Sequence, residues 1–176
     1  MHREYFGEIM SAPADIVIVD RNRLVLRRQH RDWTCSVACL RTILCTNMSE
    51  DYMIDMLGLQ PGPHYSKDMK QTVNIFGHYQ FDFGCDCDGD TQTRFAKLLT
   101  MLGIGWSVMI ETIHNGGHWL ILLGYYPVGT TIADCNLLLW DPYLGETRLE
   151  NAEEVISMWS DGNSVNDYIA VKRIST

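Results

Sequence analysis

The pattern of apolar and polar positions divides the chain into a helical part followed by a strand-rich part. After residue 30, apolar residues recur at helical spacing in four successive segments, which begin at polar residues suited to cap a helix or end at glycines. The predicted helices run from Thr34 to about Leu44, from Ser49 to about Leu57, from Ser66 to Gly77 and from about Phe95 to Gly103.

Beyond residue 103 the pattern becomes that of β-strands. Trp106, Val108 and Ile110 occupy alternate positions, and two apolar runs with aromatic and β-branched character follow at 118–126 and 137–140. A short helix at 152–159 precedes a last strand at 168–171. Helices followed by strands, without alternating βαβ units, predict an α+β fold in which a helical N-terminal half packs on an antiparallel β-sheet half.

The first 28 residues are predicted to form a hairpin extension. Two short apolar runs, Ile16–Val19 and Leu24–Leu26, flank the polar turn Asp20–Arg23. The core is expected to cover about residues 29–173, and the whole chain of 176 residues is typical of a single domain. A chain of this size buries about 70% of the surface that its unfolded form exposes, so its stability does not require disulfides.

Charge and hydropathy limit the classes of partner. The 22 acidic residues outnumber the 14 basic ones, which argues against a nucleic-acid partner because duplex binding depends mostly on phosphate neutralisation. No apolar stretch approaches the roughly 20 residues that cross a bilayer, so no membrane partner is predicted. The charged N-terminus lacks the apolar core of a signal peptide and predicts a cytoplasmic protein, with signal-independent export left open. The arginines between residues 21 and 31 suggest a solvated face, with binding of a carboxylate-bearing ligand as the alternative.

Among the six cysteines, Cys35 has the strongest case for reactivity. Without a signal peptide, free thiols are expected rather than disulfides. Cys35 lies where the first helical periodicity begins, and a helix N-terminus offers unpaired N–H groups and the positive end of the helix dipole, which both favour a thiolate. Cys39, Cys45 and Cys135 lack that position and are expected to be inert buried thiols.

Three further residues can complete a site around Cys35. His118 follows two glycines and opens an apolar strand, a position that holds an imidazole rigidly, as a general base requires. Asp141 ends the next apolar strand, where a carboxylate can orient the imidazole. Gln29 precedes Cys35 by six residues and can donate its amide N–H to an oxyanion. Taken singly, the histidine is equally well explained as a half-buried strand residue and the aspartate as a turn residue.

With Gln29, Cys35, His118 and Asp141 in this order, the sequence resembles the papain-like cysteine peptidases. It is most similar to the group that processes bacteriocins by cleaving double-glycine leader peptides. The resemblance covers about residues 24–171. Thr34 and Ser36 stand where that group has aspartate and glycine. The segments that carry the resemblance are Gln29, Asp32–Leu40, Gly117–Leu122, Trp140–Gly145 and the predicted helix Ala152–Trp159.

The resemblance implies a papain-like fold and a cysteine peptidase or amidase that hydrolyses a peptide or isopeptide bond through a thioester intermediate. It implies that Cys35 is the nucleophile, that His118 is the general base and acid, that Asp141 orients the imidazole and that Gln29 donates to the oxyanion.

Trp33, Gly117 and Trp119 are candidate substrate-binding residues, because they lie next to these positions in the sequence. The two glycines before His118 also allow a substrate chain to pass close to the backbone. No metal and no cofactor are predicted, and the expected partner is a peptide or protein substrate.

Three alternatives to a peptidase stay open at the level of sequence. The same site is an acyltransferase if an amine takes the place of water, and a papain-like shell can also be a catalytically silent binding module. A metal site at Cys85–Asp90 is the third alternative, with His114 and His118 as a further pair of ligands. The Cys-x-Cys spacing is tighter than in structural zinc sites, and a calcium-type loop would need a glutamate that is missing here, so a turn rich in Asp and Gly is the favoured interpretation.

Overall fold

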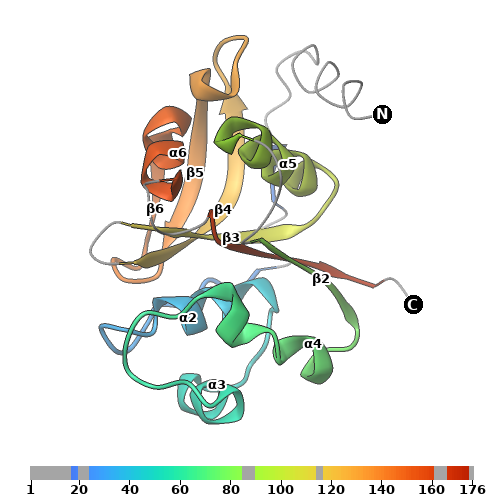
Figure 1. The fold of residues 1–176 in the computed structure, drawn as a ribbon, viewed down its shortest axis with the longest axis vertical. Helices are drawn as coiled ribbons and strands as arrows, with labels where there is room; N and C mark the ends of the chain where they lie inside the picture. Colours follow the sequence, from blue (N-terminus) through green and yellow to red (C-terminus); the bar gives the residue numbers. More distant parts are fainter. Residues whose placement is uncertain (1–16, 20–23, 85–89, 114–116, 161–165, 175–176) are drawn as a thin grey trace.

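The computed structural model describes residues 17–19, 24–84, 90–113, 117–160 and 166–174. Within this part of the chain, five α-helices accompany a seven-stranded antiparallel sheet, so the α+β class is confirmed (Figure 1). The helices are α2 (Cys35–Ile43), α3 (Glu50–Leu57), α4 (Thr72–Ile75), α5 (Thr91–Gly103) and α6 (Ala152–Ser160). The strands are β1 (Val17–Ile18), β2 (Tyr79–Gly84), β3 (Ser107–Thr112), β4 (His118–Pro127), β5 (Cys135–Asp141), β6 (Glu146–Asn151) and β7 (Tyr168–Arg173).

The sheet brings the beginning of β4 beside the end of β5. The strand order is β2-β7-β3-β4-β5-β6, and β1 makes a short additional pairing with β4. All of these pairs are antiparallel, and Ile121 of β4 lies opposite Trp140 of β5. An antiparallel pair joined by a hairpin places the start of the first strand near the end of the second. His118 and Asp141, at those two ends, are therefore brought to the same edge of the sheet.

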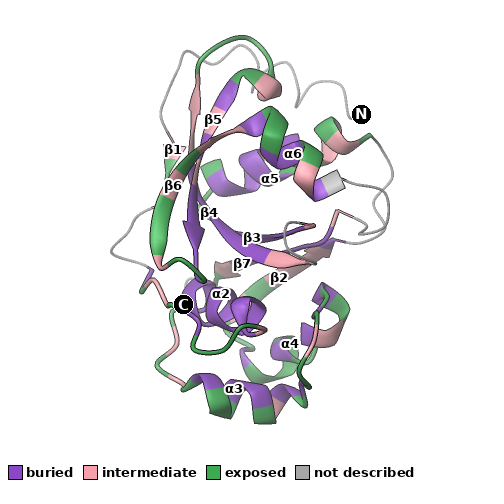
Figure 2. Cartoon of the chain, turned by 90° about the vertical axis from the view of Figure 1, so that its left-hand side faces the viewer, coloured by how far each residue is buried: buried purple, intermediate pink, exposed green. Residues whose placement is uncertain are grey.

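Helices cover both faces of the sheet, rather than the single face that the sequence pattern predicted (Figure 1). Met109 of β3 belongs to the core shared with α2 and α3, whereas its neighbours Val108 and Ile110 belong to the core shared with α5 and α6. The helix predicted at 95–103 thus lies on the opposite face from α2. Burial on both faces explains why β4 is continuously apolar from Trp119 to Leu123, and most residues of β3 and β4 are buried (Figure 2).

The ends of the N-terminal helices follow local sequence signals. α3 begins after Ser49, whose side chain accepts a hydrogen bond from the N–H of Tyr52, and ends at Gly58 in the left-handed conformation with φ of 66°. α2 begins directly after Thr34, as predicted. In the described residues, no helix combines the length and apolar character needed to span a membrane.

The prediction of one helix from Ser66 to Gly77 is wrong. The segment forms a short 3-10 helix at Ser66–Met69 and then α4. The N–H of Ser66 donates to the carboxylate of Asp167 at 2.6 Å, which ties the first turn to the residue before β7. The break changes the helical phase, so Val73 is exposed, whereas Met69 and Phe76 are buried.

The predicted N-terminal hairpin is also wrong in its pairing. Residues 24–26 form no strand, and β1 pairs with β4 instead, with Val17 opposite Tyr125. The proposed turn at 20–23 lies outside the described residues. Strands β2 and β6 had not been predicted. The polar sequence of β6 gives no strand signal, because this strand lies at the sheet edge and is largely exposed (Figure 2).

Candidate active site

Three segments that are distant in sequence meet at one cavity. It has a volume of about 590 Å³, and its lining includes Cys35, His118 and Asp141. Cys35 is the first residue of α2, His118 is the first of β4 and Asp141 is the last of β5. The structure therefore brings together the predicted nucleophile, base and orienting carboxylate.

His118 lies between these two partners. Its Nε2 lies 2.9 Å from Asp141 Oδ1, and the Cys35 side chain lies close enough to the imidazole to raise its pKa. Since Asp141 engages Nε2, Nδ1 is the ring nitrogen left for the thiol. Burial acts to lower the pKa of His118, but the hydrogen bonds and charges of Asp141 and Cys35 outweigh burial and raise the pKa to about 9. The environment therefore stabilises the protonated imidazole.

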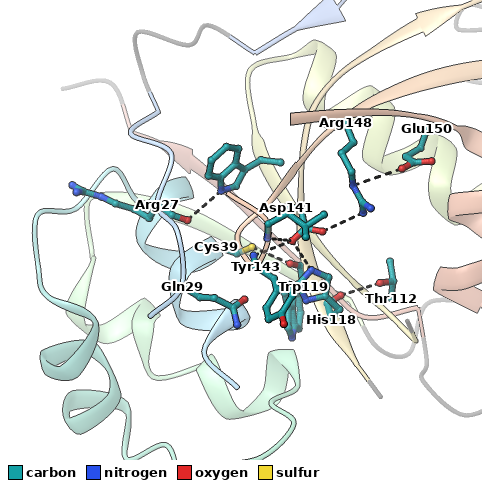
Figure 3. A network of polar contacts seen from close by, with 12 residues as sticks. Arg27, Gln29, Cys39, Thr112, His118, Trp119, Asp141, Tyr143, Arg148 and Glu150 are labelled. Carbon is teal, nitrogen blue, oxygen red and sulfur yellow. Dashed lines mark hydrogen bonds and ion pairs between the residues drawn. The ribbon is translucent and has the colours of Figure 1, made fainter. Parts of the chain in front are cut away.

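Asp141 is held as a carboxylate by several donors (Figure 3). Oδ1 also accepts hydrogen bonds from the backbone N–H groups of Tyr143 at 2.9 Å and Leu144 at 3.2 Å, while Oδ2 lies 3.2 Å from Arg148 Nη2. Burial acts to raise the pKa of the Asp141 carboxyl, but the hydrogen bond and charge of His118, with the two backbone donors, lower it below its ordinary value. The carboxylate is thus fixed in position and in charge.

Two thiols on α2 have different environments. Cys35 lies at the cavity wall and is 7% exposed, whereas Cys39, one turn further along, is fully buried. The Cys39 thiol donates to Trp119 O at 3.4 Å. Burial, followed by the nearby Cys35 and Asp141, raises the pKa of Cys39 well above its ordinary value. The prediction of a buried thiol is confirmed for Cys39, whereas Cys45 is exposed.

The loop ahead of Cys35 is held by a buried carboxylate. Glu50, the first residue of α3, accepts the Thr34 hydroxyl at 2.8 Å and the backbone N–H of His30 at 3.2 and 3.3 Å. The Thr34 side chain thereby links the start of α2 to α3 and makes no capping hydrogen bond to α2. Because a buried carboxylate is tolerated only when it is hydrogen-bonded, this contact fixes the start of α2 relative to α3.

Gln29 lies beside the turn that follows Asp141, and the described residues that line the cavity do not include it. Its backbone N–H donates to Pro142 O at 3.0 Å, and its side-chain Nε2 donates to Arg31 O at 2.7 Å. The amide nitrogen carries a second hydrogen that this contact leaves free. In this structure the Gln29 side chain stabilises the loop, and only that second N–H remains for an oxyanion.

The three predicted substrate-binding residues all line the cavity. Trp33 is half-buried, and its ring lies edge-on to His64 with centroids 5.5 Å apart. Trp119 is 1% exposed and donates from Nε1 to His64 O at 2.8 Å, so its side chain is a fixed part of the cavity wall. Gly117 has φ of 107°, which favours glycine, and a Cβ there would crowd Glu111 Oε1 at 3.0 Å.

His64 is a cavity residue that the sequence did not reveal. His64 lies in a segment without helix or strand, yet it is only 7% exposed. Its Nε2 lies 2.7 Å from Gln60 O and must donate, so Nδ1 accepts the Ser36 hydroxyl at 3.0 Å. Together with the bond from Trp119 to its carbonyl oxygen, these contacts link the residue after Cys35 to the residue after His118.

Two further cavity residues come from the region after β5. Arg148 lies on β6 and reaches back to Asp141, with its Nε 3.6 Å from Glu150 Oε1 (Figure 3). Tyr143 is 53% exposed, and its ring lies edge-on to His118 with centroids 6.5 Å apart. Spacing along the chain could not identify Arg148, because its contact depends on strand pairing.

The candidate metal ligands at 85–89 and His114 lie outside the described residues. Within the part of the chain that the structure covers, no group of three or more His, Cys, Asp and Glu side chains is placed to hold a metal ion. The four described cysteines are free thiols. No family model and no curated protein matches the chain, so its function is inferred from this geometry and from the sequence resemblance.

Proposed function

We propose that the protein is a cysteine peptidase or amidase of the papain-like clan, which hydrolyses a peptide or isopeptide bond through a thioester. The observation that carries the proposal is the position of His118, whose imidazole bonds to Asp141 and lines the same cavity as Cys35, close enough for Cys35 to raise its pKa. A helix that presents the nucleophile and a sheet that presents the base and its carboxylate also agree with the papain-like resemblance.

In the first half of the reaction, Cys35 attacks the substrate carbonyl carbon after its proton has passed to His118. The S–C bond forms, the C–N bond breaks, and His118 delivers its proton to the leaving nitrogen. The raised pKa of His118 supports this role, because the imidazole holds the proton until the leaving group needs it. Asp141 stays ionised and keeps the ring oriented through Nε2.

Charge that develops on the substrate oxygen needs hydrogen-bond donors. As the first residue of α2, Cys35 has a backbone N–H without an intrahelical acceptor. The second N–H of the Gln29 amide is the other candidate donor. A well-placed donor of this kind contributes about 3–4 kcal/mol to transition-state stabilisation.

In the second half, a water molecule gives a proton to His118 while its oxygen bonds to the thioester carbon. The C–S bond then breaks, the carboxylic product leaves, and the proton on His118 returns to the Cys35 sulfur. An amine in place of water gives a new amide by the same steps. Hydrolysis is therefore separated from acyl transfer by adding a biotinylated primary amine and measuring its incorporation into the product.

Selective alkylation tests the nucleophile. We expect iodoacetamide and a peptidyl epoxide to modify Cys35 much faster than the exposed Cys45, as measured by intact mass and peptide mapping. The modification is expected to disappear in Cys35→Ala, to slow strongly in His118→Ala and to persist in the control Cys45→Ala. Slow and equal modification of several thiols would instead support a catalytically silent binding module.

Comparison of cleavage products tests turnover and identifies substrates. A proteome incubated with the wild-type protein is expected to gain new N-termini that are missing after incubation with Cys35→Ala. Identical N-termini in the two samples would contradict a peptidase.

A further inference from the structure

A second depression adjoins the cavity that holds Cys35. It has a volume of about 350 Å³ and lies between the segment 28–32 and the turn after β5. Asp32, Tyr143 and Leu144 line both hollows, so the two adjoin at these residues. Tyr143 and Leu144 are 53% and 44% exposed and form an apolar ridge where the hollows meet. An extended peptide bound at Cys35 can therefore cross this ridge into the second depression.

Arg28 lines this second depression and is held against the turn that carries Asp141. The next residue, Gln29, donates its backbone N–H to Pro142 O at 3.0 Å. The Arg28 side chain lies over Gly145, where a Cβ would come within 3.0 Å of Arg28 Cδ. Gly145 also has φ of 73°, so the turn offers Arg28 a flat surface that other residues would obstruct.

The charge of Arg28 is not neutralised within the described part of the chain. Arg31 forms an ion pair with Asp51 at 2.6 Å, and Arg27 donates to Asn47 Oδ1 at 2.9 Å. No ion pair or side-chain hydrogen bond joins Arg28 to any described residue. In a chain with a net charge of −8, a cation in a concave site that forms no ion pair with the described residues is free to bind an external anion.

We propose that Arg28 binds a carboxylate of the peptide substrate, so that the enzyme selects peptides with an acidic group on the side of the scissile bond that enters the second depression. The guanidinium matches a carboxylate with two parallel hydrogen bonds. Asp32, at the boundary of the hollows, disfavours a second acidic residue next to the scissile bond. The inference rests on the proposed peptidase function, and the carboxylate comes from an Asp or Glu side chain or from the peptide C-terminus.

Internally quenched peptides test the selection. The probe set places Asp, Asn or Lys at each position on both sides of a cleaved bond, in versions with a C-terminal acid or a C-terminal amide. We expect the wild-type protein to prefer the carboxylate at one position, with kcat/KM lowered about 10- to 100-fold by the Asp-to-Asn change or by C-terminal amidation. If the Asp-to-Asn change lowers kcat/KM, the bound carboxylate is a side chain. If C-terminal amidation lowers it, the bound carboxylate is the peptide C-terminus.

Two charge variants assign that preference to Arg28. Arg28→Glu is expected to lose the preference for the acid and to favour Lys at the same position, whereas Arg173→Glu, an equal charge change at the exposed end of β7, is expected to retain the wild-type preference. Equal cleavage of the Asp, Asn and Lys peptides, or an acid preference that survives Arg28→Glu, overturns this inference and leaves the peptidase proposal intact. If no peptide is cleaved and Cys35 is alkylated no faster than the other thiols, both this inference and the peptidase proposal are overturned.

Discussion

His118 Nε2 lies 2.9 Å from Asp141 Oδ1, although 23 residues separate the two in sequence. His118 begins β4 and Asp141 ends β5, and the antiparallel pairing of these strands brings both to one edge of the sheet. The pair is rigid because Asp141 is also held by two backbone N–H groups and by Arg148. The orientation of the imidazole is therefore a property of the sheet rather than of a flexible loop.

Substitution of the carboxylate is expected to slow turnover without unfolding the protein. Asp141→Asn keeps the shape of the side chain but loses the charge that orients and stabilises protonated His118, so kcat is expected to fall by about 10²–10⁴-fold. The measurement is the hydrolysis rate of a cleaved peptide, with circular dichroism to verify the fold.

Glu150→Gln is the matched control for that substitution. Glu150 contacts Arg148 at 3.6 Å and does not contact Asp141 or His118 directly (Figure 3). The hydrolysis rate of Glu150→Gln is therefore expected to stay near that of the wild type. An unchanged rate in Asp141→Asn would show that another group orients His118.

The pH profile is expected to have an alkaline limb near pH 9. Protonation of the leaving nitrogen requires protonated His118, whose pKa is about 9, so kcat declines as the pH rises through that value. In Asp141→Asn the hydrogen bond and negative charge that raise the pKa of His118 are weakened, and the limb is expected to move to lower pH. A limb that stays in place in the variant would assign it to a different group.

His118 also links stability to pH in a defined direction. Its pKa is raised in the folded protein from 6.5 to about 9, so its stabilising contribution is complete below pH 6.5 and is lost as the pH rises through about 9. Urea unfolding of the wild type and of His118→Gln at pH 6 and pH 10 measures this contribution. The difference in unfolding free energy between the two proteins is expected to shrink at pH 10.

Glu111 is expected to make the protein less stable as the pH rises. Burial, followed by the charges of Asp167 and Asp68, raises the pKa of Glu111 from 4.5 to about 8, and its Oε2 has no hydrogen-bond partner among the described residues. The unfolded chain releases this proton first, so stability falls between pH 4.5 and about pH 8. Glu111→Gln is expected to remove much of this dependence and to gain on the order of a few kcal/mol at pH 8 relative to the wild type.

Thermal unfolding between pH 5 and pH 9 measures the effect of Glu111. The exposed Glu153→Gln serves as the control, since it removes a carboxylate that is solvated in both states. Parallel curves for the wild type and Glu111→Gln would contradict the raised pKa of Glu111.

The contact between Ser36 and His64 is expected to position Cys35 as well as to stabilise the fold. Ser36→Ala leaves the buried His64 Nδ1 without its donor, so the unfolding free energy is expected to fall by about 1–3 kcal/mol. Because Ser36 follows Cys35, the alkylation rate of Cys35 is also expected to fall.

Ser49→Ala separates these two effects. It removes the cap of α3 at a comparable cost of about 1 kcal/mol, but it does not touch the cavity. Equal alkylation rates of Cys35 in Ser36→Ala and Ser49→Ala would restrict Ser36 to a structural role.

Several elements could be predicted from the sequence because their signals are local. Ser49 and Gly58 mark the ends of α3 through the hydrogen bonds and backbone angles that they adopt themselves. The period-2 alternation of Tyr79, Phe81 and Phe83 in β2 was a usable strand signal that the prediction overlooked. In contrast, the break after Met69 depends on a bond to Asp167, almost 100 residues away, which no local pattern contains.

By itself, the sequence determined which residues carry the candidate chemistry and which local element presents each one. Cys35 at a helix start, His118 at a strand start and Asp141 at a strand end follow from hydrophobic periodicity, because periodicity reports where each helix and strand begins and which side chains are buried.

Only the tertiary structure decided what surrounds these residues. The pairing of β6 brought Arg148 to Asp141, burial of His64 linked Ser36 to Trp119, and the turn after β5 placed Arg28 beside the cavity. Such contacts join segments whose separation along the chain carries no signal, since they depend on the strand order and on the layer that covers each face.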